Sequence, residues 1–188
     1  ADPMRPGMDR LIAEYHRAGI KTIMITGDQS ATAQAIGEEL GLSGDQPLKV
    51  LESSALDNMD PALLAGLAKD VHVFARVSPA NKLQIVQALQ ESGYVVAMTG
   101  DGINDGPALK AADIGVAMGA GGTNVARDVS DVVLEDDNLH TMTTAVSQGR
   151  TIYSNIRKMI HFMVSTNLTE IEVMLAGIAM GAGEAMNP

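Results

Sequence analysis

The sequence has no cysteine and no tryptophan, and aromatic residues make up only 3% of its 188 residues. Without cysteine there are no disulfide bonds and no thiolate metal sites, which fits a reducing or cytosolic setting. So few aromatic side chains argue against recognition of nucleic-acid bases by stacking. Basic residues are also scarce, because 13 Lys and Arg stand against 23 Asp and Glu. The formal net charge of −10 therefore argues against nucleic acid as a partner.

Two carboxylates follow a predicted buried strand at residues 94–98. The strand runs into a glycine-punctuated loop that carries Asp101 and Asp105. Open α/β sheets bind ligands at the carboxyl ends of their strands. Two carboxylates this close repel each other unless a cation lies between them or one is protonated. Such ligands suit Mg²⁺, and the alternative is a solvated acidic turn.

A second apolar run, residues 20–25, also ends in Thr-Gly-Asp, at Thr26, Gly27 and Asp28. A helix is predicted to follow, from Gln29 or Ser30 to about residue 40. Backbone N–H groups at such a strand-to-helix turn can hold a phosphate oxyanion. The alternative is that Thr26 only caps the helix. Two such turns in one chain predict that both lie at the same edge of one sheet.

A lysine stands in the first turn of a third strand-to-helix unit. Residues 71–77 predict a strand that ends beside Arg76, and Ser78 and Pro79 then start a helix that stops at Gly93. Lys82 lies in the first turn of this helix. A cation is unfavourable there unless an anion is nearby. The alternative is a surface lysine that reaches into solvent.

The rest of the first 149 residues alternates strands with helices, as parallel sheets do. Loop 119–124 opens like a dinucleotide fingerprint, but Asn124 replaces its third glycine, so a tight turn is the better interpretation. Residues Asp136 and Asn138 predict the start of a long helix. The other expected elements are strands at 48–51, 114–118 and 131–134 and helices at 61–69, 107–112 and 123–128.

These motifs occur in the order found in one family. Residues 26–28, 74–82 and 99–105 together resemble the phosphorylation domain of P-type cation-transporting ATPases, which belong to the haloacid-dehalogenase-like hydrolases. The likeness extends through residues 108–119 to the C-terminus. It implies an α/β fold, with a Rossmann-like parallel sheet flanked by helices, and ATP and Mg²⁺ as cofactors.

The resemblance also implies a role for each site residue. Asp101 resembles the family's Mg²⁺ ligand and Asp105 its partner, while Lys82 resembles the lysine that neutralises the transferred phosphoryl group. The positions that match phosphate and nucleotide contacts are Thr26, Gly27, Asp28, Arg76 and Asn104.

One part of the family pattern is absent from this sequence. The family's nucleophile is an aspartate in Asp-Lys-Thr-Gly, and this chain contains no such tetrapeptide. We therefore expect a sheet that lacks the nucleophile strand, in a chain that starts midway through a longer protein. Lys82 and Mg²⁺ can only stabilise charge on a phosphate that another group has attacked, so we expect no ATP turnover by this chain alone.

The last forty residues have a different composition. Residues 159–180 are mostly apolar, about the length needed to span a bilayer, yet they contain Asn167, Glu170 and Glu172. Polar groups at that depth usually line an ion path. The alternative is an amphipathic helix packed on a soluble partner. By resemblance the segment is the fifth transmembrane helix of type II pumps, and Asn167 and Glu170 match cation ligands; oxygen ligands favour a hard cation such as Ca²⁺.

The resemblance therefore implies a membrane protein that is multi-pass in its parent form. Arg150, Arg157 and Lys158 place the start of the membrane helix on the cytosolic side. Residues 1–149 are expected to be a cytoplasmic, partial phosphorylation domain, and residues 150–188 a stalk and transmembrane helix. The expected partners are ATP, a Ca²⁺-like transported cation, the lipid bilayer and the remaining domains of the same pump.

Two other classes stay open on the sequence alone. A soluble haloacid-dehalogenase-like phosphatase would share the chemistry of Lys82 and Asp101, but should carry its own nucleophile and lack the apolar tail. A non-catalytic binding module would keep the sheet and have no use for Lys82.

Overall fold

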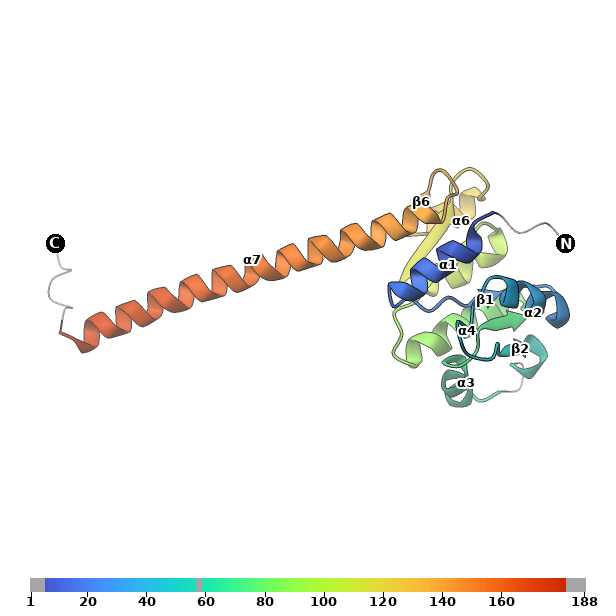
Figure 1. Cartoon of the computed structure of the whole chain (residues 1–188), viewed down its shortest axis with the longest axis horizontal. Coiled ribbons are helices and arrows are strands. Elements are labelled where there is room, and N and C mark those ends of the chain that lie inside the picture. Colours follow the sequence, from blue (N-terminus) through green and yellow to red (C-terminus); the bar gives the residue numbers. More distant parts are fainter. Residues whose placement is uncertain (1–5, 57–58, 182–188) are drawn as a thin grey trace. The chain divides into compact units, whose positions relative to one another are not determined.

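The computed structural model describes residues 6–56 and 59–181 and divides the chain into two units, residues 1–143 and 144–188. The first unit contains strands and helices in alternation, and the second is the greater part of one long helix (Figure 1). The predicted α/β class is confirmed.

The strands of the first unit form two parallel sheets. The first sheet has the order β1-β3-β2, with β1 at Met24–Ile25, β2 at Val50–Glu52 and β3 at Val73–Ala75. The second has the order β4-β5-β6, with β4 at Ala97–Gly100, β5 at Ile114–Met118 and β6 at Val132–Leu134.

The two Thr-Gly-Asp turns therefore do not belong to one sheet, and that expectation is wrong. Strands β1 and β4 are each at the edge of their own sheet. Within residues 6–56 and 59–181, no strand pairs with the outer edge of either one. The two sheets consequently meet through side chains and helices rather than through backbone hydrogen bonds.

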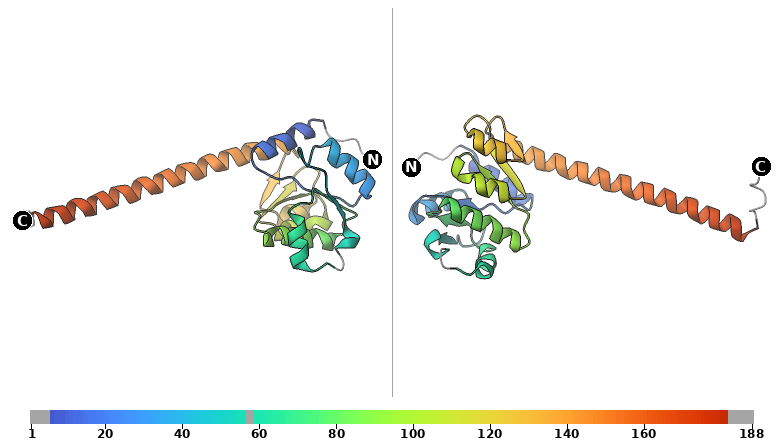
Figure 2. Two further views of the ribbon diagram at one scale, coloured as in Figure 1. Left: turned by 60° about the horizontal axis from the view of Figure 1, so that its bottom comes forward. Right: turned by 180° about the vertical axis from the view of Figure 1, so that it is seen from behind.

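Strand β3 is the centre of the first sheet, paired with β1 and β2, and its side chains alternate between two cores. Val73 and Ala75 face one cluster, shared with α1 and α2, and Phe74 faces the other, shared with α3 and α4. Helices accordingly lie on both sides of the strands (Figure 2). The helix bounds are α1 Met8–Arg17, α2 Ser30–Glu39, α3 Pro61–Ala68, α4 Pro79–Glu91, α5 Gly106–Ala111 and α6 Asn124–Val129.

One of the differences from the sequence-based expectation has a physical reason. Strand β4 begins at Ala97 rather than at residue 94, because the Val96 N–H donates to the Asp113 carboxylate (2.8 Å) and Val95 is 81% exposed. That hydrogen bond also lowers the pKa of Asp113. Helix α1 was not predicted, although Leu11 and Ile12 on it are buried.

Helix α7 runs without interruption from His140 to Ala179, as the capping signal predicts. The His140 N–H donates to Asn138 Oδ1 (3.0 Å), and the Asn138 N–H donates to Asp136 Oδ1 (3.1 Å). No residue of the helix is buried, and its length and composition suffice to cross a membrane. The predicted domain boundary at residues 149 and 150 falls inside this helix and stays a prediction.

The chain's two phenylalanines provide a matched test of the core. Phe74 is fully buried, whereas Phe162 on α7 is 72% exposed. Phe74→Ala should lower the free energy of unfolding of the first unit by about 3–5 kcal/mol, because it removes a large buried side chain and leaves a cavity. Phe162→Ala should leave it unchanged. Urea titration of the full chain in detergent micelles, followed by hydrogen exchange of β3, measures both; equal effects would contradict this core.

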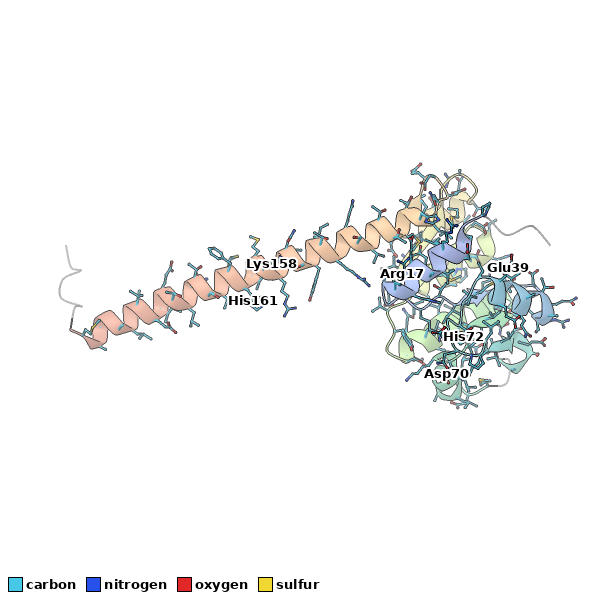
Figure 3. All side chains as sticks on the ribbon, in the orientation of Figure 1. Arg17, Glu39, Asp70, His72, Lys158 and His161 are labelled. Carbon is cyan, nitrogen blue, oxygen red and sulfur yellow. The ribbon has the colours of Figure 1, made fainter. Side chains whose placement is uncertain are left out.

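His72 makes stability depend on pH. His72 is labelled in Figure 3, and its Nδ1 accepts the Lys49 N–H at 3.2 Å. Its partial burial lowers the pKa of His72, and the positive charges of Lys21 and Lys49 lower it further. The unfolded chain then binds the proton more readily than the folded one. The contribution of His72 to the free energy of unfolding should be complete above its pKa in the unfolded chain, about 6.5. It should be lost as the pH falls through the lower pKa of His72 in the folded chain. His72→Gln should flatten that slope in urea titrations between about pH 5 and 7, whereas His161→Gln on α7 should not.

Candidate functional site

The Thr-Gly-Asp turn after β1 is closed by its own threonine. Thr26 Oγ1 accepts the Asp28 N–H and donates to Asp28 Oδ2, both at 3.1 Å. Thr26 does not cap α2, because the N-cap position is Gln29, so that alternative is wrong. Gly27 and Asp28 are exposed at the end of β1, where a ligand can reach their backbone.

Arg76 is held in a left-handed backbone conformation, with φ of 54°. Its N–H donates to the Asp28 carbonyl (2.9 Å), and its carbonyl accepts from Ser53 Oγ (2.5 Å). Non-glycine residues in this region carry backbone strain, which tends to occur at functional sites. The first hydrogen bond joins the end of β3 to the turn after β1 and places Arg76 beside Asp28, and the second joins Arg76 to the 3-10 helix after β2.

Lys82 points at a carboxylate. Ser78 caps α4, with Pro79 in the first turn, and Lys82 Nζ lies 2.5 Å from Asp105 Oδ1. The side chains are 20% and 9% exposed, respectively. The interpretation of Lys82 as a lysine reaching into solvent is therefore wrong. The anion expected near this helix start is Asp105, which comes from the other sheet.

The loop after β4 presents Asp101 and buries Asp105. Asp101 is exposed, and its carbonyl accepts the Thr123 N–H at 2.9 Å. Asp105 ends a short 3-10 helix, Ile103–Asp105, and its Oδ2 accepts the Gly102 N–H at 3.3 Å. Asn104 is exposed between the two acids.

Gly100 is required by this burial of Asp105. A Cβ atom on Gly100 would lie 2.7 Å from Asp105 Cβ, closer than real Cβ contacts. The glycine of the motif therefore makes room for the carboxylate that holds Lys82. The sequence showed the residue, but not the contact.

The carboxylates of Asp101 and Asp105 suit a Mg²⁺ ion shared with water and phosphate better than a metal site made only of protein ligands. In the parts of the chain that the structure describes, no three His, Cys, Asp or Glu residues gather as a metal site. Asp101 offers exposed carboxylate oxygens, and Asp105 lies in the same loop with Lys82 on one oxygen. Mg²⁺ is commonly held by one or two carboxylates together with water and substrate phosphate.

Asn167 and Glu170 lie on α7 in the second unit and are considered by themselves. Both are exposed and three residues apart, which places them on the same helix face. Glu172 is two residues beyond Glu170 and projects in another direction. Two oxygen-bearing side chains on one face can contribute to a cation site, but need ligands from other elements to complete it.

The contact between Asp137 and the loop at residues 119–122 was not predicted from the sequence. The Asp137 carboxylate accepts the backbone N–H groups of Ala120 and Gly121. These are the amides that a pyrophosphate would need in a dinucleotide site, which favours the interpretation of loop 119–124 as a tight turn. No local pattern links Asp137 to residues so far back in the sequence.

The chain is similar to known proteins in sequence and in fold. The family model for haloacid dehalogenase-like hydrolases matches residues 1–113. The chain belongs to the haloacid dehalogenase-like hydrolase family. The predicted fold and family are confirmed.

More specific similarity extends along nearly the whole chain. This chain is 51% identical over 174 residues to a calcium-transporting ATPase of Bacillus subtilis (strain 168), and the match covers 93% of this chain and 19% of that protein. It is 50% identical over 179 residues to the cation-transporting ATPase pma1 of Synechocystis sp. (strain ATCC 27184 / PCC 6803 / Kazusa), covering 95% and 20%. The chain spans about a fifth of the length of the curated relatives it matches.

A solved structure agrees with these relatives. The catalytic domain of the CPx-ATPase CopB-B, studied for its conformational changes upon nucleotide binding, superposes with a TM-score of 0.57 at 25% identity. The match covers 78% of this chain and 46% of that one. The predicted resemblance to P-type cation-transporting ATPases is therefore confirmed.

The two acids of the loop should differ sharply in their effect on stability. Asp105→Asn removes the charge that compensates a mostly buried Lys82, and should lower the free energy of unfolding by about 1–3 kcal/mol. Asp101→Asn changes an exposed side chain and should shift it by less than about 0.5 kcal/mol. Urea titration of both variants in one buffer makes the comparison; an equal loss in the two would contradict the pairing of Lys82 with Asp105.

Proposed function

We propose that this chain supplies the Mg²⁺ and phosphate site of an ATP-driven cation-transporting ATPase, together with one helix of its cation path. The observation that carries the proposal is the 2.5 Å contact between Lys82 and Asp105. It brings the lysine of one motif to the acidic loop of another, across two sheets. A non-catalytic binding module would use this pair only to hold the two sheets together, and the apolar helix α7 disfavours a soluble phosphatase.

Phosphoryl transfer requires positioning and charge compensation more than covalent chemistry by the protein. Lys82 offsets negative charge on the transferred group, and the exposed turn at Gly27 and Asp28 orients the phosphate. Asp101 would hold Mg²⁺ through its exposed carboxylate. Asp105 acts as its partner carboxylate, which restrains Lys82 and the Gly102 N–H. Bound Mg²⁺ supplies Lewis-acid compensation of the phosphate charge.

Nucleotide recognition falls to the exposed side chains around this centre. Arg76 and Asn104 flank the two turns and can bind the nucleotide phosphates or ribose through hydrogen bonds. The attacking carboxylate has to come from a segment outside these 188 residues, since the sequence contains no Asp-Lys-Thr-Gly. The chain alone should accordingly bind, but not turn over, ATP.

Helix α7 would carry the effect of phosphorylation into the membrane. Asn167 and Glu170 would contribute oxygen ligands to the transported cation, for which a hard ion such as Ca²⁺ is the best match. Arg150, Arg157 and Lys158 would keep the start of the membrane segment at the cytoplasmic face, with residues 1–149 in the cytoplasm.

The test uses the longer protein encoded by the reading frame that contains this chain. In membranes, that protein should form a phosphoenzyme from ATP in a Ca²⁺-dependent way, and Asp101→Asn should reduce the signal at least about tenfold. Glu170→Gln should abolish the Ca²⁺ dependence. Glu172→Gln removes the same charge two residues away and should preserve it.

Three results would count against the proposal. A reading frame that begins at Ala1 would leave no nucleophile and remove the ATPase. Magnesium-dependent ATP turnover by the present chain, lost in Asp101→Asn, would show a complete enzyme of another kind. Equal behaviour of the Glu170 and Glu172 variants would remove Glu170 from the cation path.

A further inference from the structure

The loop between β5 and α6 is occupied by a side chain from a distant segment. Asp137 Oδ1 accepts the Ala120 N–H at 3.0 Å, and Asp137 Oδ2 accepts the Gly121 N–H at 2.7 Å. Hydrogen bonds from backbone N–H groups to a carboxylate are charge-assisted and stronger than neutral ones. The carboxylate thus holds this loop in the way that a bound anion would.

The rest of the loop leaves little freedom for another conformation. The Gly119 N–H donates to the Leu134 carbonyl (2.8 Å), and Arg127 Nη1 donates to the Gly119 carbonyl (3.1 Å). A Cβ atom on Gly122 would lie 2.0 Å from the Met118 carbonyl oxygen. Both ends of the loop are therefore packed, and Asp137 holds its tip.

The loop in turn holds the backbone of Asp101. Thr123 follows the loop directly, and its N–H donates to the Asp101 carbonyl at 2.9 Å. Its hydroxyl also caps α6 by accepting the Ala126 N–H at 3.3 Å. A shift of residues 119–122 would move Thr123, and with it the carbonyl of the residue that we assign to Mg²⁺.

Asp137 contacts the loop from an unusual backbone conformation. Its φ is 50°, a left-handed value that Asp and Asn tolerate better than other non-glycine residues. The neighbouring Asp136 and Asn138 instead cap the start of α7, through the Asn138 and His140 N–H groups. Adjacent residues thus bind two different elements.

We propose that Asp137 is a positioning residue for Asp101, which links the acidic loop to the start of α7 through the Gly119–Gly122 loop and Thr123. The importance of Asp101 rests on the proposed function, but the linkage stands on the hydrogen bonds alone. Displacement of the segment before α7 would then alter the position of Asp101. In the other direction, Mg²⁺ binding at Asp101 would shift the residues at the start of α7.

The experiment measures amide hydrogen exchange by NMR on the full chain in detergent micelles. Asp137→Gly removes the carboxylate but accepts the same φ, so backbone strain does not confuse the result. It should speed exchange at Ala120, Gly121 and also Thr123 by about tenfold. Asp137→Asn keeps one acceptor oxygen and should have an intermediate effect. Asp136→Asn removes the same charge from the α7 cap and should leave Thr123 unchanged.

A second measurement uses Mn²⁺ as the probe for the Mg²⁺ site, followed by water proton relaxation. Asp137→Gly should raise the Mn²⁺ dissociation constant several-fold, whereas Asp136→Asn should not. Unchanged Thr123 exchange in Asp137→Gly, despite faster exchange at Ala120 and Gly121, would overturn the proposal. An Mn²⁺ dissociation constant that is unchanged in Asp101→Asn would instead count against the proposed function. The hydrogen-exchange data would still decide the role of Asp137.

Discussion

The contact between the two sheets rests on helix α4 and on the ion pair that it provides. Ile85 of this helix packs into the core around β3, and the next residue, Val86, packs into the core beside β4. Lys82, one turn earlier, binds Asp105 from the second sheet. A mostly buried charge is costly unless its partner is in place, so the pair favours one arrangement of the two sheets. The site and the fold therefore depend on the same contact.

The free edges of β1 and β4 follow from this arrangement. Ile25 and Val96 pack against the core around Phe74 of β3 and also against the core beside Met98 of β4. The two sheets therefore share an apolar contact without sharing a strand. Val95, next to β4, is largely exposed. Unpaired parallel edges attract further strands. In the described part of the chain, the outer edges of β1 and β4 are therefore open to such a strand.

Local patterns in the sequence identified the turns that the structure places at the ends of strands. The turn at Thr26, the lysine after Ser78 and the two acids after β4 were found because a strand, a glycine and a polar residue follow one another directly. Prediction from the sequence failed where the determining contact is distant in sequence. That Asp105 pairs with Lys82, or that β1 and β4 lie in separate sheets, depends on tertiary packing, which no short window of residues contains.

The segment from Asp136 to Asn138 shows how one pattern can hide a second role. In the sequence it is a capping signal, and the structure confirms that role for its two outer residues: the Asn138 N–H and the Thr141 hydroxyl lower the pKa of Asp136. The middle residue differs only in its backbone conformation, since a positive φ directs its carboxylate toward Gly121. Because both roles fall within three consecutive residues, the cap of α7 and the loop beside Asp101 are joined by covalent bonds and charge-assisted hydrogen bonds. Under the proposed function, this short path would connect the loop that holds Mg²⁺ with the start of α7.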